Sequence, residues 1–236
     1  MDSIDLLLTL ASGVAWTIVY IEAIRIGFVQ RTYAIPVAAL MLNVAWEWLY
    51  TIVDLSGTGG VQAYVNLVWA CADLAILFTF FRFGFAEFSD RVGRGTFAVG
   101  AVGLLAVSAV VQLLFLGEFG ERQGAAYSAF LQNLLMSGLF IAMFYARRGP
   151  RGQSLTIGIA KWFGTLAPTI QFGLLSNWAF VSGIGLLCSV LDLTYIGLLF
   201  RARGLRALPQ AASASLAPHD RPSRARTVPE RHNRPA

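Results

Sequence analysis

Residues 34–53 read AIPVAALMLNVAWEWLYTIV, an apolar run with an acid, Glu47, in its second half. A helix needs about 20 such residues to cross roughly 30 Å of hydrocarbon. A carboxylate inside that layer costs roughly 2.5–3.5 kcal/mol on insertion scales. An acidic residue is therefore found there mainly where it has a partner or a function. Asn43 precedes Glu47 by one helical turn, so both side chains lie on one face. This segment therefore predicts a functional site inside a membrane.

The rest of the chain has the composition of a polytopic membrane protein. Of its 236 residues, 56% are hydrophobic and only 13% are charged, which is about half the charged fraction of a soluble domain. The mean hydropathy is +0.63. The net charge of +5 comes from loops and from the C-terminal tail. Because no basic patch is interleaved with aromatic residues on a folded face, we expect no nucleic-acid partner.

Breaks at glycine, proline and clustered charges divide the chain into seven apolar segments. They cover, to within a few residues, 4–24, 34–54, 62–82, 96–116, 124–146, 155–175 and 179–200. Arginines follow the first, third, fifth and seventh segments, whereas the alternate loops hold only Arg122. By the positive-inside rule, the N-terminus is outside and the C-terminus is cytoplasmic. We predict an all-α, polytopic fold in which seven transmembrane helices form one bundle in the cell membrane.

The composition also predicts two parts of the chain. Residues 1–204 form the seven-helix transmembrane domain, and residues 205–236 form a basic cytoplasmic tail rich in alanine, proline and arginine. The tail has too few apolar residues to build a core, so we expect it to be disordered.

Three acids lie well inside predicted spans: Glu47, Asp73 and Asp192. With a rise of about 1.5 Å per residue, they lie about 20, 14 and 12 Å from the cytoplasmic ends of their helices. We therefore expect one buried polar layer near the membrane midplane, provided that the second, third and seventh helices adjoin. Gln132 and Asn133 of the fifth span lie at a similar depth.

Aromatic residues accompany each acid at helical spacing. Trp46 and Tyr50 lie beside the acid of the second span. Trp69 precedes the acid of the third span by four residues, and Tyr195 follows that of the last span by three. An aromatic face attracts a desolvated cation by up to about 2 kcal/mol. The pattern therefore indicates a site that handles positive charge.

Other charged residues of the spans are expected to be structural. Glu22 and Asp54 lie near helix ends, where they can reach the interface or pair with Arg25. Lys161, the only lysine, lies near the start of the sixth span, so we expect its amine to reach the cytoplasmic surface. A retinal-binding receptor needs a lysine in the last span, and this chain has none there.

The stretch Asn43-Val-Ala-Trp-Glu-Trp-Leu-Tyr50 resembles the Asn-x-x-Trp-Glu-x-x-Tyr signature of integral-membrane terpene cyclases. That family includes fungal enzymes of meroterpenoid and indole-diterpene pathways and bacterial drimentine-type enzymes of indole-sesquiterpene biosynthesis. Three further stretches are similar to it: residues 69–84, 132–137 and 192–195. The resemblance covers residues 1 to about 204.

The resemblance implies a membrane-bound terpene cyclase of isomerase or lyase type that is redox-neutral and independent of metals. In this family an acid protonates a terminal alkene or epoxide of a prenylated substrate, and internal alkenes then close rings on the resulting carbocation. The resemblance implicates Glu47 and Asp192 as catalytic carboxylates, with Asp73 as a third. Residues expected to bind substrate or stabilise the cation are Asn43, Trp46, Tyr50, Trp69, Gln132, Asn133 and Tyr195.

The residues themselves agree with such chemistry. Protonating an alkene requires a neutral carboxylic acid, and burial among apolar groups favours that form. Neighbouring carboxyls also favour a shared proton, and exclusion of water protects the cation. The chain has neither an Asp-Asp-x-x-Asp nor an Asp-x-Asp-Asp motif, and both histidines lie in the tail. We therefore expect no metal and no other cofactor.

The main alternative is a proton- or cation-coupled transporter of small molecules, in which the three acids form a relay at the midplane. Against it, no internal repeat of the kind that many transporters contain is visible. For a cyclase, the expected partners are a prenylated substrate, such as a farnesylated indole or cyclodipeptide, and membrane lipid. The sequence leaves the oligomeric state and the exact substrate open.

Overall fold

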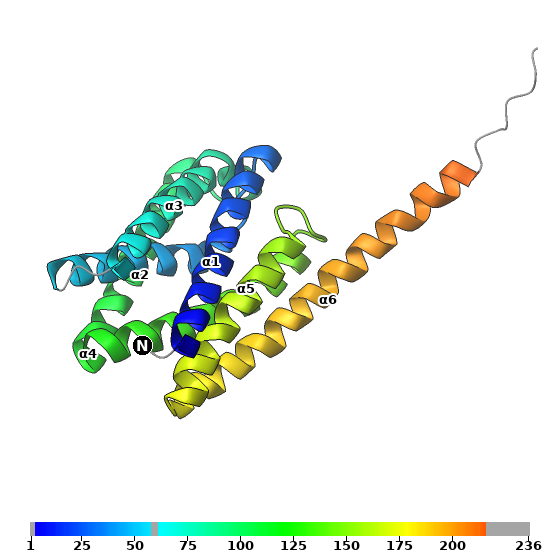
Figure 1. The fold of residues 1–236 in the computed structure, drawn as a ribbon. Coiled ribbons are helices and arrows are strands. Elements are labelled where there is room, and N and C mark those ends of the chain that lie inside the picture. The colour runs from blue at the N-terminus through cyan, green and yellow to red at the C-terminus, as the bar shows by residue number, and fades with distance from the viewer. Residues whose placement is uncertain (1–2, 58–60, 216–236) are drawn as a thin grey trace, which may run out of the picture. The chain divides into compact units, whose positions relative to one another are not determined.

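The computed structural model describes residues 3–57 and 61–215, and these are helices joined by short turns (Figure 1). The helices are α1 (Ser3–Gln30), α2 (Val37–Ser56), α3 (Val61–Phe83), the short 3₁₀ helix η1 (Gly84–Glu87), α4 (Arg94–Ala146), α5 (Leu155–Pro168), the π-helical turn η2 (Thr169–Leu175) and α6 (Ala179–Ser215). The all-α class predicted from the sequence is confirmed for the described residues.

The sequence marks several helix ends. Pro36, with a φ of −55°, precedes α2, where a missing backbone N–H costs nothing. Ser154 caps α5, because its hydroxyl accepts a hydrogen bond from the backbone N–H of Thr156. Asn177, with a φ of 58°, makes the turn between η2 and α6, in the short break that the sequence predicts there. Asparagine tolerates this left-handed conformation better than most residues.

Helix α4 consists of two antiparallel halves. Gly120 has a φ of 72°, a conformation that favours glycine, and it reverses the chain direction there. Across the turn, a Cβ on Gly124 would lie 2.6 Å from the carbonyl oxygen of Phe115, so only glycine fits. Farther along, Gln112 donates a hydrogen bond to Gln132 at 3.0 Å. The halves coincide with the two separate segments that the sequence predicts at 96–116 and 124–146.

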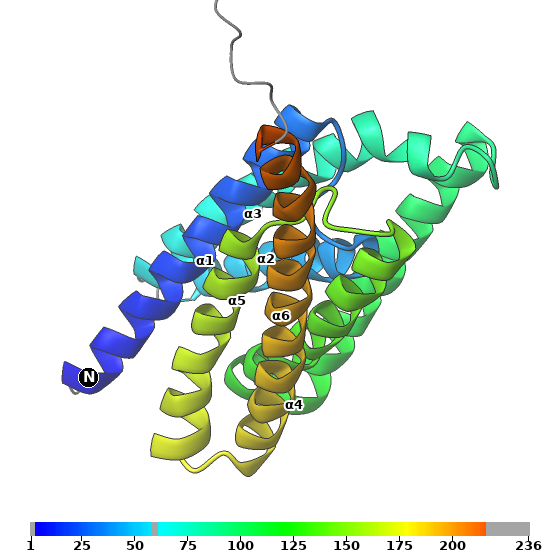
Figure 2. The same cartoon turned by 90° about the vertical axis from the view of Figure 1, so that its right-hand side faces the viewer.

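The helices pack around an apolar core. Helix α1 packs against α3 and α5, and α2 packs against α3 and α4, as Figure 2 shows from the side. Fully buried side chains at the centre include Ile26, Leu40, Ile76 and Phe140. Many large apolar side chains lie instead on the outside of the helices, as in Leu7, which is 66% exposed. Such an outer surface is typical of a protein solvated by lipid.

Four helices in the described part of the chain are long and apolar enough to cross a membrane: Ser3–Gln30, Ala63–Glu87, Arg94–Ala146 and Ala179–Gly204. The sequence predicts seven spans. The difference has physical reasons. Two predicted spans form the single element α4, which folds back at Gly120. Helix α2 carries polar groups that lower its hydropathy, and the predicted span 155–175 is divided into α5 and η2.

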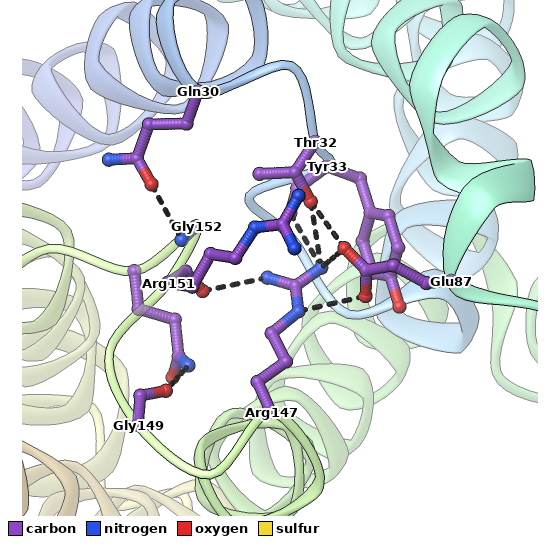
Figure 3. Close-up of polar contacts among 9 residues, drawn as sticks. Gln30, Thr32, Tyr33, Glu87, Arg147, Gly149, Arg151 and Gly152 are labelled. Carbon is purple, nitrogen blue, oxygen red and sulfur yellow. Dashed lines mark hydrogen bonds and ion pairs between the residues drawn. The ribbon is translucent and has the colours of Figure 1, made fainter.

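One end of the bundle is held by an arginine that joins three connecting segments (Figure 3). Arg147, at the end of α4, donates hydrogen bonds to both carboxylate oxygens of Glu87 at 3.0 and 3.1 Å. It also donates to the Thr32 hydroxyl and the carbonyls of Tyr33 and Arg151. Its guanidinium lies 4.2 Å from the centre of the Tyr33 ring. The connections after α1, after α3 and after α4 therefore meet at the same end.

The chain divides into two units, Met1–Ala202 and Arg203–Ala236. The helix α6 continues to Ser215, past the boundary at residue 204 that the composition predicts. The rest of the predicted tail, residues 216–236, lies outside the described residues. Its disorder therefore stays a prediction.

Loss of the Arg147 cation should destabilise the bundle. Arg147→Met removes five hydrogen bonds and leaves the Glu87 carboxylate, whose side chain is only 20% exposed, without a cation. Breaking a buried ion pair costs roughly 3–5 kcal/mol, so the thermal midpoint in detergent should fall clearly. Arg148→Met, which alters the exposed neighbour, is the control. Equal midpoints for the two variants would contradict this account.

Candidate active site

Two of the three predicted acids meet at the centre of the bundle through two hydrogen-bonding neighbours. Tyr20 of α1 donates its hydroxyl proton to Oε1 of Glu47 at 3.1 Å. Asn43 donates from Nδ2 to the Tyr20 hydroxyl at 2.7 Å and to Oδ2 of Asp73 at 2.9 Å. We call these four residues the acid cluster. It joins α1, α2 and α3.

The acid cluster is buried, and its two carboxyl groups lack a cation. Glu47 is 4% and Asp73 is 1% exposed. Neither takes part in an ion pair within the described part of the chain, and Oε2 of Glu47 has no hydrogen-bond partner there. A small cavity of about 10 Å³, lined in part by Asn43 and Asp73, remains beside them. That volume is at the lower limit for one water molecule, so the site is nearly dry.

Two glutamines of α4 extend the hydrogen-bond network of the acid cluster. Gln132 donates to Oδ1 of Asn43 at 3.4 Å, and Gln112 donates to Oε1 of Gln132 at 3.0 Å. Both glutamines are buried. They fix the orientation of the Asn43 amide, because its oxygen accepts from α4 while its nitrogen faces α1 and α3. The predicted site residue Gln132 therefore contacts the acids through Asn43.

Asp192 lies in a separate polar group and is paired with a cation. The ammonium of Lys161 donates to both carboxylate oxygens of Asp192, at 2.9 and 3.0 Å, and to the hydroxyl of Ser137 at 2.6 Å. The expectation that Lys161 reaches the cytoplasmic surface is wrong, because its side chain is fully buried. Burying an ammonium group away from water is costly, and the close ion pair with Asp192 offsets that cost.

The remaining predicted residues near Asp192 support this group. Asn133 donates to the hydroxyl of Thr165 at 2.6 Å, and Thr165 donates to the carbonyl of Lys161 at 2.9 Å. Tyr195 is fully buried, and its ring lies 5.1 Å from that of Phe140. No hydrogen bond or ion pair among the described residues joins Asp192 or Lys161 directly to the acid cluster. Depth along the membrane normal is thus no guide to which side chains pair.

The predicted aromatic residues of α2 and α3 line the helix contacts around the acid cluster. Trp69 stacks on Tyr20 with ring centres 6.0 Å apart, and its indole N–H donates to Thr17 at 3.2 Å. Trp46 donates its indole N–H to the carbonyl of Ala125 at 3.0 Å, and its ring lies 5.0 Å from that of Tyr50. Trp69 therefore touches the cluster, whereas Trp46 and Tyr50 anchor α2 to α4.

An apolar groove of about 310 Å³ opens along the same stretch of α2. It is lined by Val44, Ala45, Trp48 and Leu49 of α2 and by Leu105, Ala109 and Leu113 of α4. With 3.6 residues per turn, these α2 residues lie on the side of the helix away from Asn43 and Glu47, and no residue of the acid cluster lines the groove.

Sequence reasoning missed three functional candidates: Tyr20, Lys161 and Ser137. Tyr20 offered no signal, because a lone tyrosine in an apolar segment is usually a packing residue. The signal for Lys161 was present: it is the only lysine in the chain and it falls inside an apolar segment. An intramembrane cation commonly pairs with an intramembrane acid.

Comparison with known proteins gives the family. A family model described as Pyr4-like transmembrane terpene cyclases matches residues 1–200. The chain is 27% identical over 214 residues to the terpene cyclase pyr4 of Aspergillus fumigatus, covering 82% of this chain and 85% of that protein. It is 26% identical over 171 residues to the Pyr4-family terpene cyclase mfmH of Annulohypoxylon moriforme, covering 70% and 68%. No solved structure matches.

The family model describes transmembrane terpene cyclases, and both of these relatives are terpene cyclases. The chain belongs to the Pyr4-like transmembrane terpene cyclases, which confirms the family resemblance seen in residues 43–50.

Removing the Tyr20 hydroxyl should weaken the acid cluster in both stability and activity. Tyr20→Phe keeps the ring on Trp69 but leaves Oε1 of Glu47 without its donor. We expect a loss of about 1–3 kcal/mol in stability and a drop in cyclisation rate. The measurements are the thermal midpoint in detergent and product formation in membranes. Tyr64→Phe, at an exposed position on α3, is the control, and an equal effect on both quantities there would contradict the assignment.

Proposed function

We propose that this protein starts a carbocation cyclisation by protonating the terminal alkene or epoxide of a prenylated substrate. As the substrate class we propose a farnesylated indole or cyclodipeptide, carried in the lipid phase. The observation that carries the proposal is the acid cluster, in which two buried carboxyl groups share the neighbours Tyr20 and Asn43 and pair with no cation of the described residues.

Burial and proximity decide the protonation of that pair. Two ionised carboxylates in a nearly dry site would repel one another and would lose their hydration. The pair is therefore expected to hold at least one proton, shared between Glu47 and Asp73. Oε2 of Glu47 is the oxygen without a hydrogen-bond partner in the described chain, which leaves it free to donate to a substrate.

The surroundings suit the later steps of such a reaction. After protonation, the electron pair of an internal alkene attacks the cationic carbon and forms a ring bond, and the charge moves to the next carbon. The rings of Tyr20 and Trp69 stack beside the acids and offer faces to that charge. Loss of a proton ends the cascade, so the product is an isomer and the reaction is redox-neutral, without a cofactor.

The proposed topology is seven spans in the cell membrane, with the N-terminus outside and the C-terminus in the cytoplasm. Three observations support it. The helical segments follow the seven predicted ranges once α4 is divided at Gly120. The connections after α1, α3 and α4 meet around Arg147 at one end, as alternating spans require. That end also carries the exposed arginines Arg31, Arg82 and Arg148, which favours the cytoplasmic side.

Membranes that contain the protein should convert a prenylated indole or cyclodipeptide into a ring-closed isomer of equal mass. A panel of farnesylated and geranylgeranylated compounds, each as terminal alkene and as epoxide, is assayed by mass spectrometry and NMR. Glu47→Gln and Asp73→Asn should each lower the rate by about a hundredfold or more, because proton transfer contributes that much.

Glu118→Gln, at an exposed acid of α4, is the matched control and should keep the wild-type rate. Full activity of both Glu47→Gln and Asp73→Asn would contradict initiation by the acid cluster. Flux of protons or of a small amphiphile into liposomes that Glu47→Gln abolishes, without any cyclised product, would favour a transporter instead.

Labelling of two serines replaced by cysteine tests the topology. Ser56 and Ser89 are both exposed but lie at predicted outer and cytoplasmic ends. In a Cys71→Ala background, an impermeant maleimide added to intact cells should label Ser56→Cys and should label Ser89→Cys only after lysis. The reverse pattern would contradict the orientation.

A further inference from the structure

Lys161 is the only lysine among the 18 basic residues of the chain, and it is fully buried. An ammonium group has three protons to donate. All three are used here, on the two oxygens of Asp192 and on the hydroxyl of Ser137. Both oxygens of Asp192 therefore accept hydrogen bonds from a cation. A cation that donates to both oxygens favours the ionised carboxylate, which has no proton to give, while each oxygen keeps a second lone pair that can accept one.

The acid cluster presents the opposite environment. Its donors are the neutral hydroxyl of Tyr20 and the neutral amide of Asn43, and one oxygen of Glu47 has no partner in the described chain. When two carboxyl sites of one enzyme differ in this way, the environments assign the proton donor and the proton acceptor.

We propose that Lys161 is a positioning residue that holds Asp192 as a carboxylate, so that Asp192 accepts the proton that ends the cascade. This inference rests on the proposed cyclase function. In the terminating step a C–H bond beside the last cationic carbon breaks, its electron pair forms the new alkene, and the proton passes to Asp192. One proton leaves the acid cluster and one reaches Asp192 in each turnover, so the cycle closes when that proton returns to the acid cluster.

Within residues 3–57 and 61–215, Asp192 forms an ion pair with Lys161 and with no second cation. From α5 the charged group that faces it is Lys161, and from α4 the polar group is the Ser137 hydroxyl. On α6 the titratable neighbours are the buried Cys188 and Tyr195, both neutral groups at neutral pH. Among the residues that the structure describes, Lys161 is therefore the one cation that hydrogen-bonds to Asp192.

A double-variant cycle tests the ion pair without a substrate. Lys161→Met and Asp192→Asn each leave a buried charge unpaired, so each should lower the thermal midpoint of the purified protein in detergent. The double variant removes both charges and should lie closer to the wild type than the sum of the two losses. Additive losses, or an Asp192→Asn protein as stable as the wild type, would overturn the proposal.

The pH profile tests the role of Lys161 in turnover of whichever panel compound the wild type converts. Without the cation, burial disfavours the charged carboxylate that accepts the proton, so Lys161→Met should be slowed by about a hundredfold at neutral pH and should recover as the pH rises. Lys161→Arg keeps the charge and should keep the wild-type profile. If Asp192 were the proton donor, Lys161→Met would be as fast as the wild type, or faster, at neutral pH, which would overturn the proposal.

Two further outcomes keep the inference testable. If Lys161→Met does not fold, the Lys161→Met/Asp192→Asn protein takes its place. It lacks the proton acceptor and should be slow at every pH, and a wild-type rate would overturn the proposal. Failure of the wild type to convert any panel compound contradicts the proposed function. Conversion together with an additive cycle contradicts the role of Lys161 alone.

Discussion

The constraint on which the structure depends is the burial of two carboxyl groups, Glu47 and Asp73, on neighbouring helices without a cation in the described chain. Water cannot satisfy these groups in a nearly dry interior, so side chains must. Asn43 reaches Asp73, and Tyr20 reaches Glu47. The positions of α1, α2 and α3 relative to one another follow from these contacts as much as from the apolar core.

Helix α4 supplies further side chains that hydrogen-bond to the buried polar groups. The reversal at Gly120 brings Gln112 beside Gln132, and Gln132 fixes the Asn43 amide. At the far end, Arg147 holds the connecting segments together. A bundle whose outer face is apolar gains little from hydrophobic contact in lipid. Specific polar contacts of this kind therefore carry much of the helix arrangement, and the same contacts shape the proposed site.

The sequence predicts the helices well, because the length of an apolar run and the glycine, proline and charged residues that end it are local features of the sequence. It also pairs Asn43 with Glu47, since both lie one turn apart on a single helix. Lys161 was misplaced because its choice between the surface and a partner depends on Asp192, a residue 31 positions away. Depth estimates put the three acids in one layer but could not show that Asp192 has a hydrogen-bond partner of its own, Lys161, separate from those of the other two. Lateral positions depend on helix packing, which no single segment encodes.

The central claim is that the acid cluster holds a proton whereas Asp192 does not. Infrared difference spectroscopy of the purified protein measures this directly, without a substrate, because a protonated carboxyl and a carboxylate absorb at separate frequencies. The account predicts that Glu47→Gln/Asp73→Asn removes a protonated-carboxyl band and that Asp192→Asn removes a carboxylate band. Loss of only carboxylate bands from the acid cluster, or loss of a protonated band with Asp192→Asn, would contradict it.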